Sequence, residues 1–408
     1  MENFSGLLGI VVLLFIAFLL SDNRKAINIK TVSVGLMLQF IFAIFILKTP
    51  FGAPIFSFLD QAIMRLISFS DSGSNFLFTS YIDGVGFDPG LINFAFKTLP
   101  TIIFFSSLVS VLYHFGVIQK IVKFIARLMQ KTMGTSGSET LSVSGNIFLG
   151  QTESPLMVRP FISKMTKSEL MAIMTGGFAT VSGGVLAIYV AWLSKIPGIA
   201  GHLLAASVMS APAALVIAKI IYPETKKSKT MGDLNIEIKQ SHTNGMEALS
   251  TGATDGLKLA ANIAAMLIAF ISFVAMINFF LAYLGTSMEA IFGFIFRPLA
   301  WTMGVPWSDA ELVGMLMGKK IVLTELIAYG DLQKMIINGE ITSDSRTAII
   351  STYALCGFSN FGSIGIQLGG IGAMAPDRKK DLAKLVTKAM FGGALASWLT
   401  ATIAGILI

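Results

Sequence analysis

The sequence predicts an all-α polytopic membrane protein with eight transmembrane helices, two re-entrant helical hairpins in an inverted repeat, and one interfacial helix. The first observation behind this prediction is the composition. Of the 408 residues, 54% are hydrophobic and only 13% are charged, and the mean hydropathy is +0.75. A soluble globular protein usually has about 25% charged residues. The second observation is that two polar, helix-breaking stretches, each containing a glutamate, interrupt the apolar pattern.

Eight apolar segments predict the transmembrane helices. They are residues 6–20, 31–47, 91–118, 170–193, 203–222, 256–284, 347–374 and 385–408. A weaker, amphipathic pattern over residues 51–69 has Asp60 and Arg65 on its polar side and predicts a helix that lies in the membrane interface. Residues 70–90 are rich in Gly, Ser and Asp, which predicts an outside loop.

Basic residues follow the first, third, fifth and seventh of these segments and therefore mark their cytoplasmic ends. The clusters are Arg24, Lys25 and Lys30; Lys120, Lys123, Arg127 and Lys131; Lys226, Lys227 and Lys229; and Arg378, Lys379 and Lys380. With an even number of spans, both termini are expected outside the cytoplasm. Because topology explains these charges, the net charge of +7 does not indicate nucleic-acid binding.

The first polar break is the sequence GQTESP at residues 150–155, between two short apolar pieces. Proline and glycine interrupt helices, and a carboxylate at membrane depth carries a large desolvation cost. Backbone unwinds at that depth only where it is buried in protein or lines a wet cavity. We therefore predict a re-entrant hairpin over residues 136–160, entered from the cytoplasmic side. The alternative is a cytoplasmic loop that carries a capped helix start.

The second polar break is the sequence GKKIVLTE at residues 318–325, in a region where no apolar piece makes a clean span. Its Thr324 and Glu325 match Thr152 and Glu153 of the first break, and each break precedes two spans. The expected topology opens the first hairpin from the inside and the second from the outside. This arrangement predicts two inverted units whose tips meet near the bilayer midplane, as in secondary transporters.

Polar side chains from both units meet if the two tips meet. Together they suit a neutral, polyhydroxylated ligand with a flat hydrogen-bonding edge, and Phe358 offers an apolar wall. The alternative for Asn360 and Ser363 is that they join adjacent helices. The candidates are Gln151, Thr152 and Glu153 in the first unit and Glu325, Asn360 and Ser363 in the second.

A coupling cation needs oxygen ligands near such a ligand. Asn146, Thr180 and Ser182 provide side-chain oxygens, and unwound backbone near Gly150 and Gly183 adds carbonyls. This set suits sodium, which transporters bind with backbone and side-chain oxygens at broken helices. The alternative for Asn146 is an interhelical hydrogen bond. The single cysteine and the three dispersed histidines predict no zinc site, and no organic cofactor is expected.

At these residues the chain resembles the concentrative nucleoside transporter family, over nearly its whole length. The matching motifs are NIFLGQTE at residues 146–153, GKK to ELIAY at 318–329, and ALCGFSNFGS at 354–363. The resemblance implies a bacterial inner-membrane symporter that imports uridine-type nucleosides with sodium by an elevator-like, alternating-access movement. It also implies a homotrimer in the lipid bilayer.

The family's site residues are carried over to matching positions. For the nucleobase, the resemblance implies Gln151, Thr152 and Glu153, with Val185 as an apolar neighbour. For the ribose, it implies Glu325, Asn360 and Ser363, with Phe358 lining the pocket. For sodium, it implies Asn146, Thr180 and the backbone carbonyls of Leu149 and Val181. The chain departs from the family pattern at Thr324, where asparagine is usual, and at Thr180, where serine is usual.

With this resemblance the chain divides into five parts. Residues 1–132 are N-terminal scaffold helices, and residues 133–222 hold the first hairpin with spans four and five. Residues 223–255 are a cytoplasmic linker, and residues 256–300 are the sixth span, which is also scaffold. Residues 301–408 hold the second hairpin with spans seven and eight.

A symporter driven by protons, or one for another polar metabolite, is the alternative within transport. An open channel conflicts with two obstructing tips. An intramembrane enzyme lacks a catalytic constellation beyond Glu153 and Glu325.

Overall fold

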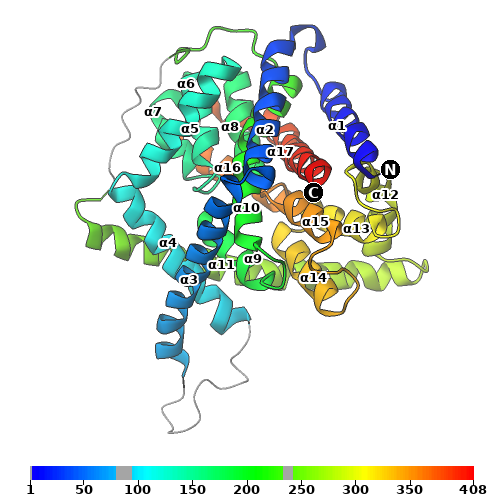
Figure 1. Cartoon of the computed structure of the whole chain (residues 1–408). Coiled ribbons are helices and arrows are strands. Elements are labelled where there is room, and N and C mark those ends of the chain that lie inside the picture. Colours follow the sequence, from blue (N-terminus) through cyan, green and yellow to red (C-terminus); the bar gives the residue numbers. More distant parts are fainter. Residues whose placement is uncertain (1, 80–93, 233–241) are drawn as a thin grey trace.

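The structure, a computed structural model, describes residues 2–79, 94–232 and 242–408 (Figure 1). Every named element in these ranges is helical. The α-helices are α1 (Glu2–Leu19), α2 (Ile29–Lys48), α3 (Gly52–Phe78), α4 (Leu99–His114), α5 (Val117–Met133), α6 (Gly137–Gly145), α7 (Arg159–Ile162), α8 (Lys167–Ala179), α9 (Gly183–Trp192), α10 (Ile199–Ile221), α11 (Gly245–Ala282), α12 (Met288–Thr302), α13 (Ala310–Val322), α14 (Glu325–Ile337), α15 (Arg346–Leu355), α16 (Phe361–Met374) and α17 (Lys379–Leu407). Short 3-10 or π-helical turns are η1 (Arg24–Ala26), η3 (Phe94–Thr98), η4 (Ser154–Val158) and η5 (Pro376–Arg378).

Several helices in the described ranges are long and apolar enough to cross a membrane. There are five, and the pair α4 and α5, bent by 74°, makes a sixth if it is one span. The five are Ile29–Lys48, Lys167–Trp192, Ile199–Ile221, Gly245–Ala282 and Pro376–Leu407. The predicted first span corresponds to a shorter apolar helix, and the predicted third span begins outside the described residues. The chain is thus a multi-pass helical membrane protein.

Both predicted hairpins have helical arms and an interrupted tip. In the first, α6 begins at a capping box in which Ser136 and Glu139 bond each other's backbone amides, and Pro155 lies in the first turn of η4. In the second, α13 ends where Leu323 adopts φ −104° and ψ −99°, which no helix continues. Thr324 then caps α14 by accepting a hydrogen bond from an amide of its first turn. Helix breaks at both predicted positions are therefore confirmed.

Two predicted spans are each two helices in the structure. Span 170–193 is α8 followed by α9, and span 347–374 is α15 followed by α16. The chain is extended at Thr180, which ends α8, and Gly357 between α15 and α16 has φ +112°. Unwound backbone was expected near Gly183 in the first of these spans. The break in the second was not predicted, because the hydropathy of that segment is continuous across it. Each unit therefore has the same order of elements: hairpin, broken span and long helix.

The two broken spans touch at their interruptions. The Ser359 hydroxyl donates a hydrogen bond of 2.8 Å to the carbonyl of Phe178 at the end of α8. A Cβ added at Gly357 would lie 2.6 Å from the same carbonyl oxygen. The close approach of two backbones and the positive φ both require glycine at this position.

Replacing Gly357 with alanine is expected to destabilise the protein by about 1–3 kcal/mol, because alanine meets both a strained φ and a backbone oxygen. Thermal unfolding of the detergent-purified protein measures the change. Gly365→Ala is the matched control, since Gly365 lies in α16 with nothing within 4 Å of an added Cβ. Equal unfolding temperatures for the two variants would refute a glycine requirement at 357.

The two units pack around α10 and α17, which contact each other and also α8 and α15. Figure 1 shows α10 near the centre, with α4 to α7 on one side and α12 to α15 on the other. Outside the units, α4 packs along α11 and α1 packs against α12 and α17. The two units therefore share one central layer of helices.

Two predicted boundaries differ from the structure. Residues 70–78 were predicted as loop but continue helix α3, and the remainder of that predicted loop lies outside the described residues. Helix α11 begins at Gly245, inside the predicted linker 223–255, because Asn244 caps it by accepting a hydrogen bond from Glu247 N. Polar residues at the end of α3 and at the start of α11 concealed these boundaries in the sequence.

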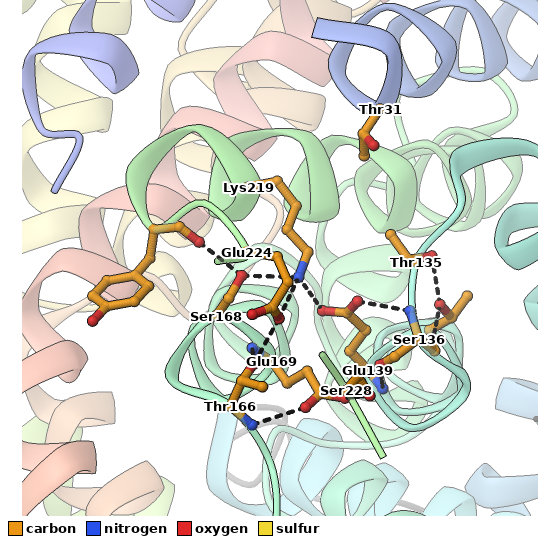
Figure 2. Close-up of polar contacts among 12 residues, drawn as sticks. Thr31, Thr135, Ser136, Glu139, Thr166, Ser168, Glu169, Lys219, Glu224 and Ser228 are labelled. Carbon is orange, nitrogen blue, oxygen red and sulfur yellow. Dashed lines mark hydrogen bonds and ion pairs between the residues drawn. The ribbon is translucent and has the colours of Figure 1, made fainter. Parts of the chain in front are cut away.

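A buried polar cluster fastens the first hairpin to α8, α10 and the start of the linker (Figure 2). Lys219 of α10 forms an ion pair of 2.7 Å with Glu139 of α6. The carboxylate of Glu169, at the start of α8, accepts hydrogen bonds of 2.6 Å from the hydroxyls of Ser136 and Ser228. Because Ser228 belongs to the predicted linker, the first part of that linker is attached to the first unit.

Candidate functional site

The second tip presents a buried carboxylate to side chains from both units. Glu325, at the start of α14, accepts hydrogen bonds from the Tyr189 hydroxyl of α9 at 2.8 Å and from Asn360 Nδ2 at 2.9 Å. The other amide atom of Asn360, Oδ1, accepts from the backbone amide of Ser363 at 2.8 Å and so caps α16. The structure thus brings Glu325, Asn360 and Ser363 together, as the sequence predicts.

The first tip is more open. Glu153 accepts a hydrogen bond from the Gly150 amide at 2.9 Å, which closes the turn of the tip. The side chain of Glu153 is exposed and lines a cavity of about 560 Å³ between the first hairpin, α4 and α11. Leu149 and Ser182 line the same cavity. The carboxylate of the first tip is therefore accessible to solvent through this cavity, whereas Glu325 is buried.

Helix α16 connects the two tips. Its N-cap Asn360 contacts Glu325, and further along the same face Gln367 Nε2 donates to Gln151 Oε1 at 3.2 Å. A Cβ added at Gly370, one turn later, would lie 2.4 Å from the Thr152 side chain. Seven residues of α-helix rise about 10 Å, so both tips reach one face of α16 about two turns apart.

Helix α9 connects the tips from the other unit. At its start the Gly183 amide donates to the Phe148 carbonyl of the first hairpin at 3.1 Å, and near its end Tyr189 bonds Glu325. Val185 lies between these two contacts and is buried. The Tyr189 ring stacks on Tyr329 of α14, with centroids 4.2 Å apart. Both tips therefore contact α9 as well as α16.

Two contributors to this arrangement, Tyr189 and Gln367, are absent from the sequence-based candidates. A glutamine in an apolar span was the available signal for Gln367, since such side chains usually bond across helices. Nothing in the sequence distinguished Tyr189 from other aromatic residues. Phe358, predicted as a wall of the site, is half-buried beside the interruption of its span.

The candidate ion site contains an orphaned amide. Asn146 ends α6 and is fully buried, and neither its Oδ1 nor its Nδ2 has a hydrogen-bond partner among the described residues. A Cβ added at Gly176 would lie 3.2 Å from Asn146 Nδ2, so this amide lies against the last turn of α8. Thr180, which follows that turn, donates to the Gly176 carbonyl at 3.0 Å.

The surroundings of this amide fit a small cation bound by neutral oxygens. The last carbonyls of α8 lack intrahelical partners, and a helix C-terminus carries partial negative charge. Leu149 and Val181 are both buried. They lie in the two backbone segments that are joined by the hydrogen bond from the Gly183 amide to the Phe148 carbonyl. An unpaired buried amide costs about 1–3 kcal/mol, which a coordinated cation would offset. The predicted sodium ligands are thus in one neighbourhood.

Two interrupted hairpins and two broken spans that meet at buried polar groups are the architecture of a secondary transporter. Comparisons with known proteins agree with this class. Family descriptions match over most of the chain: "Na+ dependent nucleoside transporter N-terminus" at residues 8–81, "Nucleoside recognition" at 95–195 and "Na+ dependent nucleoside transporter C-terminus" at 202–405. The chain therefore belongs to the concentrative, Na+-dependent nucleoside transporter family that its motifs resemble.

Individual relatives support this membership. An uncharacterized transporter of Haemophilus influenzae is 42% identical over 100% of this chain and 98% of its own length. Sodium/nucleoside cotransporter 1 of Mus musculus is 41% identical over 100% of this chain, which spans 64% of that longer protein. The solved structure of CNTnw in an inward-facing substrate-bound state has a TM-score of 0.91 and 40% identity, covering 100% of this chain and 98% of that one. A CNTnw variant in an outward-facing state has a TM-score of 0.90 at 39% identity, with the same coverage of both chains.

Proposed function

We propose that the protein is a secondary active symporter that imports nucleosides of the uridine type, driven by a sodium gradient. The observation that carries this proposal is the pair of tips held on one face of α16 about two helical turns apart. That separation suits a nucleoside, with its base at one tip and its ribose at the other. Relatives that are named sodium/nucleoside cotransporters support the same substrate and ion.

At the second tip, Glu325 provides the recognition of the ribose. A carboxylate accepts two hydrogen bonds from neighbouring hydroxyls, and charge-assisted bonds are the stronger kind. Asn360, which donates to this carboxylate, and Ser363, whose backbone amide donates to Asn360, are assigned to the same ribose contacts. Phe358 is assigned to the apolar lining of the pocket. The Tyr189 hydroxyl and the Asn360 amide each donate to one oxygen of this carboxylate.

At the first tip, Gln151, Thr152 and Glu153 hold the nucleobase. An amide offers both a donor and an acceptor, which match the edge of a base. Val185, buried on α9 between the two tips, packs against its ring. A site built from paired donors and acceptors rejects analogues that lack the matching group, because its own polar atoms would then be unpaired.

Sodium binds beside the first tip, coordinated by Asn146, Thr180 and the carbonyls of Leu149 and Val181. The ion would satisfy the orphaned Asn146 amide and hold the tip residues in place for the base. Binding of ion and substrate is then mutually favourable, and the coupling is equal in both directions. This coupling links import of the nucleoside to entry of sodium.

We infer an inward-facing conformation from the residues that line the cavity at Glu153. Arg159 and Asp255, near the predicted cytoplasmic ends of their elements, line it together with Glu153. Transport would move the hairpin-bearing units against α4 and α11 in an elevator-like, alternating-access cycle. The most apolar window of α11 has none of its residues buried within the chain, so we assign this helix to lipid and to a homotrimer interface. We place the protein in a bacterial inner membrane with both termini outside the cytoplasm.

Uridine uptake into proteoliposomes tests the function. With an inward sodium gradient, labelled uridine is expected to accumulate above its equilibrium level, and without sodium it is not. Accumulation driven by a proton gradient alone would instead establish the proton-coupled alternative. Equilibration without accumulation would indicate a channel, and failure to carry uridine at all would overturn the substrate assignment.

Deoxynucleosides test the recognition of the ribose separately. Loss of one hydroxyl should weaken binding by about 1–3 kcal/mol, because a hydrogen bond to the charged carboxylate is lost. Competition by 2′-deoxyuridine and 3′-deoxyuridine against labelled uridine measures this difference. Competition equal to that of uridine from both analogues would dismiss hydroxyl recognition.

A further inference from the structure

A lysine lies fully buried in the second unit, beside the interruption of its broken span. Lys320 of α13 has no exposed surface, and its ammonium donates to the carbonyls of Ala354 and Cys356, both at 2.9 Å, and to the Ser397 hydroxyl at 2.7 Å. These contacts use all three donors of an ammonium. All three partners are neutral oxygens, whereas the adjacent Lys319 forms ion pairs with Asp331 and Glu289.

The Lys320 ammonium lies at the C-terminal end of helix α15. Helix α15 ends at Leu355, and its last carbonyls lack intrahelical partners. The C-terminus of a helix carries partial negative charge, so a cation there is stabilised. Lys320 is thus a cation at the interior end of the first half of a broken span.

The first unit also has a helix that ends inside the protein, but the side chain beside that end is neutral. Helix α8 is the first half of its broken span, and it also ends inside the protein, at Ala179. The hairpin side chain beside that end is the neutral Asn146, which has no partner in the part of the chain that the structure describes. Asn146 and Lys320 both come from the first arm of their hairpin, shortly before the glutamate of the tip.

We propose that Lys320 is a built-in cation that occupies, in the second unit, the position that sodium occupies in the first. The inference rests on the proposed sodium site and extends it. One half of the site then needs an ion to become ordered, whereas the other half, with Glu325, is held by a charge of the protein itself. Each protomer consequently takes up one sodium ion per nucleoside.

Three variants separate this role from simple packing. Lys320→Ser removes the charge and leaves room for an ion, and Lys320→Met removes the charge but fills the space. Lys334→Ser is the matched control, because Lys334 is exposed on the same hairpin. Uridine uptake and sodium-induced thermal stabilisation are measured for each variant across sodium concentrations, and fluxes of labelled sodium and uridine give the ion ratio.

The wild type and Lys334→Ser are expected to transport about one sodium ion per uridine, with a Hill coefficient of about 1 for sodium. Lys320→Ser should lose uptake at low sodium and regain it at high sodium, with a Hill coefficient that approaches about 2. Lys320→Met should not regain uptake. Sodium should also stabilise Lys320→Ser over a wider range of concentrations than it stabilises the wild type.

Two results would overturn the inference. One is a wild-type ratio of about two sodium ions per uridine, which decides the matter even if Lys320→Ser does not fold. The other is a folded Lys320→Ser whose uptake and thermal stabilisation respond to sodium as Lys320→Met does. Sodium-independent uptake by the wild type would instead refute the proposed function, so the two failures are distinguishable.

Discussion

Replacing Glu325 with glutamine is expected to weaken uridine binding by about 1.5–3 kcal/mol, roughly 10–150-fold, because a charge-assisted hydrogen bond to the ribose is lost. The geometry adds a second reason. Asn360 directs its Nδ2 donor at one carboxylate oxygen and Tyr189 directs its hydroxyl at the other. A glutamine has only one acceptor atom in its side chain, so it can satisfy only one of these donors.

Isothermal titration calorimetry with uridine in saturating sodium measures this loss. Glu340→Gln is a matched control, because Glu340 is exposed beyond the end of α14 and its side chain bonds only Asn338 in the described contacts. The control should bind uridine like the wild type. An unchanged affinity in Glu325→Gln would remove Glu325 from the ribose site.

Replacing Asn146 with alanine is expected to raise the half-saturating sodium concentration about 5- to 150-fold, since removing a ligand of the ion costs about 1–3 kcal/mol. In sodium-free buffer the same variant should be no less stable than the wild type, because both amide atoms of Asn146 are buried without partners. The pair of expectations distinguishes an ion ligand from a residue that joins two helices.

The sodium dependence of uridine uptake and the unfolding temperature with and without sodium are the two readouts. Asn338→Ala, at an exposed amide after α14, is the control for both. A variant at 146 that keeps its sodium response would place the ion elsewhere. A variant that is destabilised even without sodium would favour the interhelical hydrogen bond.

Local chemistry made both hairpin breaks predictable. Gly150 and Pro155 break a helix wherever they occur, and Thr324 followed by Glu325 is a helix start in the middle of an apolar region. The polar residues near these breaks were therefore identifiable as one site before their contacts were known. Their proximity was expected from the topology, and the hydrogen bonds from Tyr189 to Glu325 and from Gln367 to Gln151 join the two units beside the tips.

The interruption of span seven depends on tertiary contacts and was not predictable in the same way. Gly357 adopts its positive φ because another backbone, at Phe178, passes against it, and that neighbour is far away in sequence. The same holds for Tyr189 and Gln367, whose partners lie on other units. From the sequence, Lys320 could be recognised only as a basic residue next to an apolar stretch. Its three acceptors are far away in sequence, in α15, in the residue after α15 and in α17.

A structure of the protein with uridine and sodium bound tests most directly whether one substrate lies between the two tips. The ribose hydroxyls are expected within hydrogen-bond distance of Glu325 and Asn360, the base against Gln151, and the ion beside Asn146. A nucleoside that contacts only one tip, or one that lies away from α16, would contradict the proposed site.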